Sequence, residues 1–139
     1  MKKILSILFT TITIVNASWF PSIFNTSKAE KKEPMLQSTK FSQIENKIGK
    51  ISMMLEFGAT SCHSCVVMGK ILYKIKQKYP NAHIYFIDIN EDNDAAKKFA
   101  IRMIPTQKYL DKSGNVIETH MGVIKQGELE LKLNTLGIL

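Results

Sequence analysis

The sequence predicts an α/β domain built on one mixed four-stranded sheet with helices on both faces. From residue 42 to residue 100, segments of helical character alternate with short apolar runs that are typical of buried strands. Such alternation favours parallel strands joined by helices. Residues 106–121 instead predict two strands joined by a tight turn, which pair antiparallel. A sheet of this mixed kind is covered by helices on its two faces.

The first 29 residues predict a signal peptide or an N-terminal membrane anchor. Two lysines precede an apolar stretch at 4–15, whose length is typical of the hydrophobic region of a signal peptide. Small residues ending at Ala17 form a cleavage pattern, and a second such pattern ends at Ala29. Apolar character continues to Phe24, so a retained anchor is the alternative to cleavage. Both alternatives place the folded domain outside the cytoplasm, as in a periplasm.

The stretch that follows predicts a linker and then a short helix. Residues 30–40 are polar, include Pro34 and lack a hydrophobic period, which predicts a linker before a domain at 41–139. Residues 42–45 (Ser-Gln-Ile-Glu) match a capping box and predict the start of a helix that Gly49 ends.

Two apolar runs predict the first two strands, with a helix between them. Residues 52–57 form an apolar run broken only by Glu56, and residues 82–89 are rich in β-branched and aromatic side chains. Between these runs, a helix is predicted from Cys62 to the residue before Pro80. Apolar residues recur on one face of that helix, at Val67, Ile71, Leu72, Ile75 and Tyr79.

The second half of the domain predicts a helix, a hairpin and a final helix. Asn93 or Asp94 can cap a short helix over 95–100. Strands at 106–110 and 116–121 are joined by Asp-Lys-Ser-Gly-Asn, a sequence with the chemistry of a hairpin turn. The last helix is predicted over 125–136.

Composition argues against several classes of partner and cofactor. The formal net charge is +7, but the lysines are scattered and no aromatic-basic motif accompanies them, so we expect no nucleic-acid partner. A zinc site needs four ligands, and the three histidines lie on separate predicted elements. Covalent haem attachment needs a histidine directly after the second cysteine, where this chain has Val66. We therefore expect neither a metal nor another cofactor.

Cys62-His63-Ser64-Cys65 contains the only two cysteines and predicts a redox centre. A structural disulfide stabilises most when it closes a long loop, and this pair would close almost none. At the start of a helix, free backbone N–H groups and the helix dipole favour a thiolate, which makes Cys62 the candidate nucleophile. Cys65, one turn further on, is the candidate resolving thiol. His63 either tunes Cys62 or is a polar loop residue, and the sequence leaves both open.

Two motifs together resemble the thioredoxin family over about residues 41–136. One is Phe-Gly-Ala-Thr-Ser-Cys-His-Ser-Cys at 57–65, and the other is Ile-Arg-Met-Ile-Pro-Thr at 101–106, with Gly122 beyond it. This resemblance implies the thioredoxin fold and a thiol–disulfide oxidoreductase.

The resemblance also implies roles for three further residues. Glu56 occupies the position of a buried acid that exchanges a proton with Cys65. A carboxyl in an apolar strand should have a raised pKa, which agrees with that role; the alternative is an acid on an exposed strand face. Pro105 corresponds to a cis-proline beside the nucleophile. Ile104 is implied to offer its backbone to an extended segment of the substrate.

The chain departs from the family pattern in ways that suit an exported relative. Ser61 replaces a tryptophan, His63-Ser64 replaces Gly-Pro between the cysteines, and Phe86 stands where cytoplasmic thioredoxins carry a lysine. We expect a monomer that exchanges disulfides with substrate proteins and receives electrons from a membrane partner.

The direction of electron flow is predicted from the length of one connection. Oxidants of this fold usually carry a large helical insertion, and residues 91–105 are too few to hold one, which favours a reductant. A disulfide-donating oxidant remains an alternative. A copper-binding chaperone on the same fold is a second alternative, with the cysteines and thioethers such as Met68 and Met103 as soft ligands.

Overall fold

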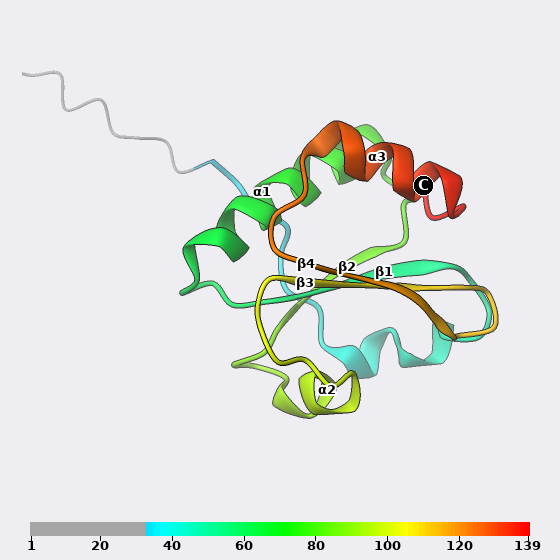
Figure 1. Cartoon of the computed structure of the whole chain (residues 1–139), viewed down its shortest axis with the longest axis horizontal. Helices are drawn as coiled ribbons and strands as arrows, with labels where there is room; N and C mark the ends of the chain where they lie inside the picture. The colour runs from blue at the N-terminus through cyan, green and yellow to red at the C-terminus, as the bar shows by residue number, and fades with distance from the viewer. Residues whose placement is uncertain (1–32) are drawn as a thin grey trace, which may run out of the picture. The chain divides into compact units, whose positions relative to one another are not determined.

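The computed structural model describes residues 33–139, which contain one four-stranded sheet (Figure 1). The strands are β1 (Met53–Gly58), β2 (Ile84–Asp88), β3 (Thr106–Leu110) and β4 (Val116–Met121), in the spatial order β2-β1-β3-β4. β1 and β2 are parallel, whereas β1–β3 and β3–β4 are antiparallel. The predicted mixed sheet is confirmed.

Helices cover both faces of the sheet, as the sequence predicts. α1 (His63–Lys78) and α3 (Gln126–Thr135) lie over one face, and α2 (Asn93–Lys98) lies over the other (Figure 1). Two 3-10 turns, η1 (Phe41–Gln43) and η2 (Glu45–Lys47), join α2 on the second face. The helix ends differ from the predicted ones by a few residues, as is usual for helix boundaries.

The central strand β1 divides the core into two layers. All six of its residues are buried, and its side chains alternate between the two faces of the sheet. Met53, Leu55 and Phe57 pack with α2 and the 3-10 turns, whereas Met54 packs under α1 and α3. By the same alternation Glu56 shares the face of Met54. The acid of this strand therefore lies beneath the helix that begins beside Cys62.

The predicted helix with its cap at Ser42 is wrong in type and position. Two successive 3-10 turns occupy the segment, and the first begins at Phe41. Lys40 is the residue before it, and its backbone N–H donates to Oε1 of Gln43 at 3.2 Å. The three-residue period of a 3-10 turn places Phe41 and Ile44 on the same side, where both are buried.

The predicted cap of the short third helix is also wrong. Asp92, rather than Asn93 or Asp94, caps α2, and its Oδ1 accepts the backbone N–H of Ala95 at 3.3 Å. The other oxygen, Oδ2, accepts the backbone N–H of Phe41 at 2.8 Å. One carboxylate thus fixes the start of α2 and the start of η1, a long-range contact that no local pattern reveals.

The buried face of α1 is rotated from the predicted one. Its buried residues are Cys65, Met68, Gly69, Leu72 and Ile75, whereas Val67 and Ile71 are only half-buried. The stripe still has helical spacing, but it starts at Cys65. The second cysteine is therefore part of the core.

Residues 33–40 lie against the domain. The backbone N–H of Leu36 donates to the carbonyl of Gly69 at 2.9 Å, and that of Thr39 donates to the carbonyl of Phe86 at 2.7 Å. This part of the predicted 30–40 linker is therefore tied to α1 and β2. The predicted signal peptide or anchor at 1–29 lies outside the described residues. Between residues 33 and 139, no helix combines the length and the apolar character that crossing a membrane requires.

Candidate active site

Cys62 is the N-cap residue of α1. Its backbone is extended (φ −94°, ψ 119°), and helical geometry begins at His63. The Cys62 Sγ accepts the backbone N–H of Cys65 at 3.3 Å and lies 3.3 Å from Oγ of Ser64. This sulfur therefore lies at the positive end of the helix dipole and against a free backbone donor. Both features stabilise a thiolate on Cys62 once the disulfide opens.

Cys62 and Cys65 form a disulfide in which the two sulfurs differ in access. Their Cα atoms are 5.2 Å apart. Cys65 is 0% exposed, whereas Cys62 is half-buried and follows the exposed Ser61. Since thiol–disulfide exchange requires contact with the attacked sulfur, an incoming thiol can reach Cys62 and not Cys65. This asymmetry fits the predicted division into nucleophile and resolving thiol.

A buried carboxylate holds the loop that presents Cys62. Asp88, at the end of β2, is 3% exposed. Its Oδ2 accepts the backbone N–H of Thr60 at 3.0 Å, and its Oδ1 accepts that of Asn90 at 2.9 Å. Within the loop, the N–H of Cys62 donates to the carbonyl of Ala59 at 3.1 Å. Asp88 was not among the predicted site residues, although an acid at the end of an apolar strand is a signal that could have identified it.

Gly58 allows α1 to start close to the sheet. A Cβ on Gly58 would lie 2.8 Å from Cε2 of Phe86 and 3.1 Å from Cβ of Cys65. Neither neighbour is the free end of a flexible chain, because Phe86 and Cys65 are both fully buried. The missing side chain therefore sets how closely Cys65 approaches the end of β1.

We expect Gly58→Ala to destabilise the oxidised protein by about 1–3 kcal/mol, the usual cost of overpacking a filled core. Urea unfolding measures this loss. The matched control is Gly127→Ala in α3, where an added Cβ meets nothing within 4 Å, so its effect should be neutral or stabilising by up to about 1 kcal/mol. Equal unfolding midpoints for the two variants would show that the space at Gly58 is not tight.

Glu56 is fully buried on β1, so the alternative of an exposed strand face is wrong. Its nearest partners across the sheet are Phe86 on β2 and Gln107 on β3. Burial raises the pKa of Glu56 well above its ordinary value, and the amide of Gln107 opposes this only in part. Among the described residues, neither carboxylate oxygen has a hydrogen-bond partner. Such a group favours its protonated form and can accept or release a proton in a buried site.

Pro105 lies at the same end of the sheet as Cys62. The register pairs Phe57 with Thr106, so the residue before β3 lies beside the end of β1, from which the chain continues to Cys62. Figure 1 shows the loop after β1 and the loop before β3 at one end of the sheet. The Ile104–Pro105 peptide bond is cis, the configuration that the family resemblance implies. Pro105 is buried and Ile104 is half-buried.

Gln107 is a second buried polar residue that was not among the predicted site residues. It is 0% exposed, and its Nε2 donates to the carbonyl of Gly122 at 3.1 Å. The N–H of Gly122 in turn donates to the carbonyl of Pro105 at 2.8 Å. The sequence places Gln107 on the same strand face as Tyr109. Its importance, however, depends on which residue of β1 it faces across the sheet.

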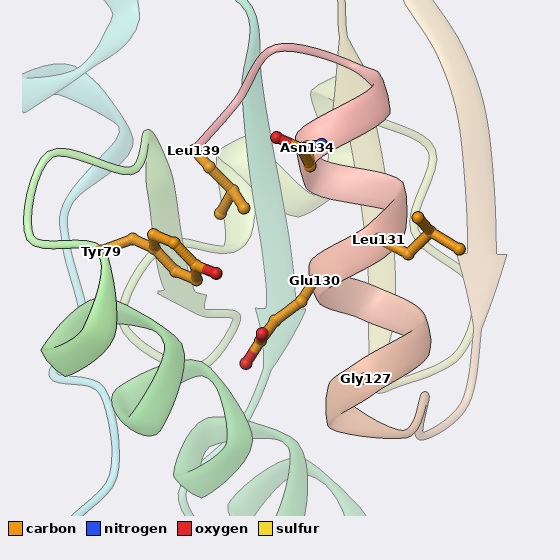
Figure 2. Close-up of a pocket in the computed structure, with 6 residues that line it drawn as sticks. All are labelled: Tyr79, Gly127, Glu130, Leu131, Asn134 and Leu139. Atoms are coloured by element: carbon orange, nitrogen blue, oxygen red, sulfur yellow. The ribbon is translucent and has the colours of Figure 1, made fainter.

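A pocket between two helices lies away from the cysteines. It has a volume of about 590 Å³ and lies between the end of α1 and α3, where Tyr79 and Glu130 reach into the space between the helices (Figure 2). Its lining residues are Tyr79, Gly127, Glu130, Leu131, Asn134 and Leu139. Cys62 caps the opposite end of the 16-residue helix α1, about 24 Å away at 1.5 Å per residue. The disulfide therefore lies outside this pocket.

The described part of the chain offers no cluster of metal ligands. No three side chains of His, Cys, Asp or Glu between residues 33 and 139 come close enough to hold an ion. The chemistry that the arrangement supports directly is thiol–disulfide exchange at Cys62, with a buried carboxyl on the sheet face that α1 covers.

Known proteins resemble this chain in sequence and in structure. The family model for thioredoxin matches residues 32–135. Thioredoxin from Pongo abelii is 24% identical over 98 residues, which cover 70% of this chain and 92% of the relative. Thioredoxin-1 from Saccharomyces cerevisiae is 30% identical over 70 residues, or 50% of this chain and 67% of the relative. The solved structure of Malassezia sympodialis thioredoxin has a TM-score of 0.61 at 23% identity, covering 73% of this chain and 90% of that one, and shares the fold.

Proposed function

The chain belongs to the thioredoxin family, and from this premise we propose that it is an exported protein thiol–disulfide oxidoreductase that reduces disulfides in substrate proteins. One observation supports the proposal most: the half-buried Cys62 caps α1, while its disulfide partner Cys65 is fully buried. A pair built in this way has one sulfur for attack from outside and one for resolution from within.

The proposed reaction has two exchange steps. The Cys62 thiolate attacks a substrate disulfide, forms a mixed disulfide and displaces one substrate thiolate. Cys65 then gives its proton to the carboxylate of Glu56 and attacks the Cys62 sulfur. The bond between Cys62 and the substrate breaks, the second substrate thiolate leaves, and the Cys62–Cys65 disulfide remains. The substrate gains two electrons, and a donor must return two to the enzyme.

Four other residues are assigned supporting roles in this proposal. The backbone of Ile104 pairs with an extended substrate segment, and Pro105 holds that backbone at the end of the sheet beside Cys62. His63 and Ser64 tune the potential of the pair, since Oγ of Ser64 lies 3.3 Å from the Cys62 sulfur and His63 is the exposed first residue of α1.

The proposed export and direction rest on separate observations. The sequence of residues 1–29 supports export, and an exported reductant needs a membrane electron-transfer protein as its donor. The connection between β2 and β3 contains only the six-residue helix α2, and this short connection supports a reductant over an oxidant with a helical insertion.

Redox potential is the measurement that tests the proposal. We expect equilibration against glutathione to give a value close to that of thioredoxin, about −270 mV, and the reduced protein to reduce insulin. A value close to about −120 mV would instead establish the oxidant. Stoichiometric cuprous copper binding that survives a competing chelator, without insulin reduction, would establish the copper chaperone.

A further inference from the structure

We propose that Gln107 is a positioning residue whose amide orients the Glu56 carboxyl for proton exchange with Cys65 and connects it to Gly122, which is hydrogen-bonded to Pro105. This inference rests on the proposed function and adds to it a residue that the proposed mechanism does not use. It follows from the register of the sheet, from the hydrogen bonds of Gln107 and from two unpartnered buried groups.

The register places Gln107 directly opposite Glu56. The two residues are cross-strand partners on β1 and β3, and both are 0% exposed. Side chains directly opposite in an antiparallel pair have Cβ atoms about 4.5–5.5 Å apart. The partner of Glu56 on its other side is Phe86, which offers no hydrogen-bonding group. The polar neighbour of the acid within the sheet is therefore Gln107.

One end of the Gln107 amide is already fixed. Its Nε2 donates to the carbonyl of Gly122 at 3.1 Å, and the N–H of Gly122 donates to the carbonyl of Pro105 at 2.8 Å. A carbonyl can only accept, so this bond sets which end of the amide is nitrogen. The second hydrogen on Nε2 and both lone pairs on Oε1 remain for a neighbour.

Glu56 is the neighbour that can bond to the free hydrogen and lone pairs of the Gln107 amide. Among the described residues, Oε1 of Gln107 and both carboxylate oxygens of Glu56 are buried without a partner, and buried polar groups in folded proteins are nearly always paired. A protonated Glu56 can donate to Oε1 of Gln107, whereas an ionised Glu56 can accept from the second N–H of the amide. The amide can therefore form a hydrogen bond with Glu56 in both protonation states of the acid, while its bond to Gly122 keeps the amide in place.

The ionised form gains more from this contact. Hydrogen bonds to a charged acceptor are about twice as strong as neutral ones, so the amide should favour carboxylate over carboxylic acid. That direction agrees with the effect of Gln107 on the pKa of Glu56, which opposes the larger effect of burial. Removing the amide should then raise the pKa further and leave the carboxyl without a fixed orientation.

Other titratable or charged groups also lie on this face of the sheet or in the helices over it. Cys65 comes from α1, Asp88 from β2, Tyr109 from β3, Glu118 and His120 from β4, and Glu128 and Lys132 from α3. Cys65 does not titrate in the disulfide form. Work on the oxidised protein therefore removes the coupling that would otherwise mix the titrations of Cys65 and Glu56.

The test compares Gln107→Met with Tyr109→Phe in the oxidised full chain. Methionine keeps the length of glutamine without its amide, and Tyr109→Phe removes a buried, unpartnered hydroxyl from the same face of β3. Carbon-13 NMR of the Glu56 carboxyl gives its titration midpoint in each protein. We expect a larger upward shift in Gln107→Met than in Tyr109→Phe. An unchanged or lower midpoint in a folded Gln107→Met protein would overturn the proposal.

A second measurement needs no Gln107 variant and covers the case in which Gln107→Met fails to fold. In the unaltered chain, the side-chain amide resonance of Gln107 should titrate with the midpoint of Glu56, and in Glu56→Gln that titration should disappear. An amide resonance that does not shift as Glu56 titrates would contradict the proposal. Neither NMR measurement depends on turnover. If the protein proved not to be an oxidoreductase, the results of both measurements would therefore be unchanged.

Kinetics then tests the role in proton exchange. We expect Gln107→Met to slow resolution of a preformed mixed disulfide by roughly ten-fold, a part of the roughly 100- to 10,000-fold that general acid–base catalysis contributes. In a Glu56→Gln background the same change should slow resolution no further, because the group it positions is gone. Equal slowing in both backgrounds would mean that Gln107 acts on stability alone.

Discussion

Cys62→Ser should abolish the reduction of insulin disulfides, whereas Cys65→Ser should stop turnover after the first exchange and accumulate mixed disulfides with protein substrates. The reason is the difference in access: Cys62 caps α1 and is half-buried, and Cys65 is 0% exposed. Without Cys62 an incoming disulfide meets no reachable thiol. Without Cys65 the mixed disulfide forms, but no internal thiol resolves it.

Insulin precipitation measures turnover, and non-reducing gel electrophoresis after alkylation measures trapped complexes. The double variant Cys62→Ser/Cys65→Ser is the matched control and should trap nothing. Circular dichroism of each variant separates loss of chemistry from loss of fold. Insulin reduction by Cys62→Ser, or mixed disulfides formed through Cys65 in that variant, would refute the assignment of nucleophile and resolving thiol.

The hairpin shows how much of the fold local chemistry determines. Both strands, β3 and β4, match their predicted bounds. Asp111 explains this, because its Oδ1 accepts the backbone N–H groups of Ser113 and Asn115, each at 2.9 Å. Gly114 supplies the positive φ of +85° that the turn needs. The hydrogen bonds of this turn all lie within residues 111–115, so a local sequence pattern is sufficient to predict it.

The roles of two further site residues follow from pairings between distant parts of the chain. The motifs predict Cys62, Cys65 and Pro105 as site residues, and an apolar strand around Glu56 predicts its burial. Gln107 matters because β3 pairs with β1 in a register that places it opposite Glu56. Asp88 matters because a loop 28 residues earlier in the chain donates to it. Such pairings depend on how distant strands align, and a one-residue slip would change every partner.

Glu56→Gln should make the protein more stable at neutral and alkaline pH and slower in disulfide exchange. Burial raises the pKa of Glu56 well above its ordinary value, so the folded protein holds this proton more tightly than the unfolded chain does. Below the unfolded pKa of about 4.3 both states are protonated, and ionisation of this carboxyl does not change the stability. As pH rises from there to the folded pKa, ionisation favours the unfolded chain, and wild-type stability falls.

Glutamine cannot ionise, so the stability difference between Glu56→Gln and wild type should grow with pH over that window and then level off. Each unit between the folded and unfolded pKa is worth about 1.4 kcal/mol. Urea unfolding of both oxidised proteins across the pH range measures the difference. Glu128→Gln is the control, because Glu128 is exposed and its replacement should give no such gain. A difference that does not change with pH would mean that Glu56 has the same pKa in both states.

The same substitution should slow resolution of the mixed disulfide by roughly 100-fold or more, the usual contribution of a positioned acid or base. Cys65 then has no buried carboxylate to take its proton, and because it is fully buried, water is a poor substitute. Stopped-flow release of a thiol from a preformed mixed disulfide measures this step. Gain of stability together with loss of rate would show that the chain retains a costly buried acid for its chemistry. Gain of stability with no change in rate would contradict a proton-transfer role for Glu56, and Cys65 would then have to lose its proton by another route.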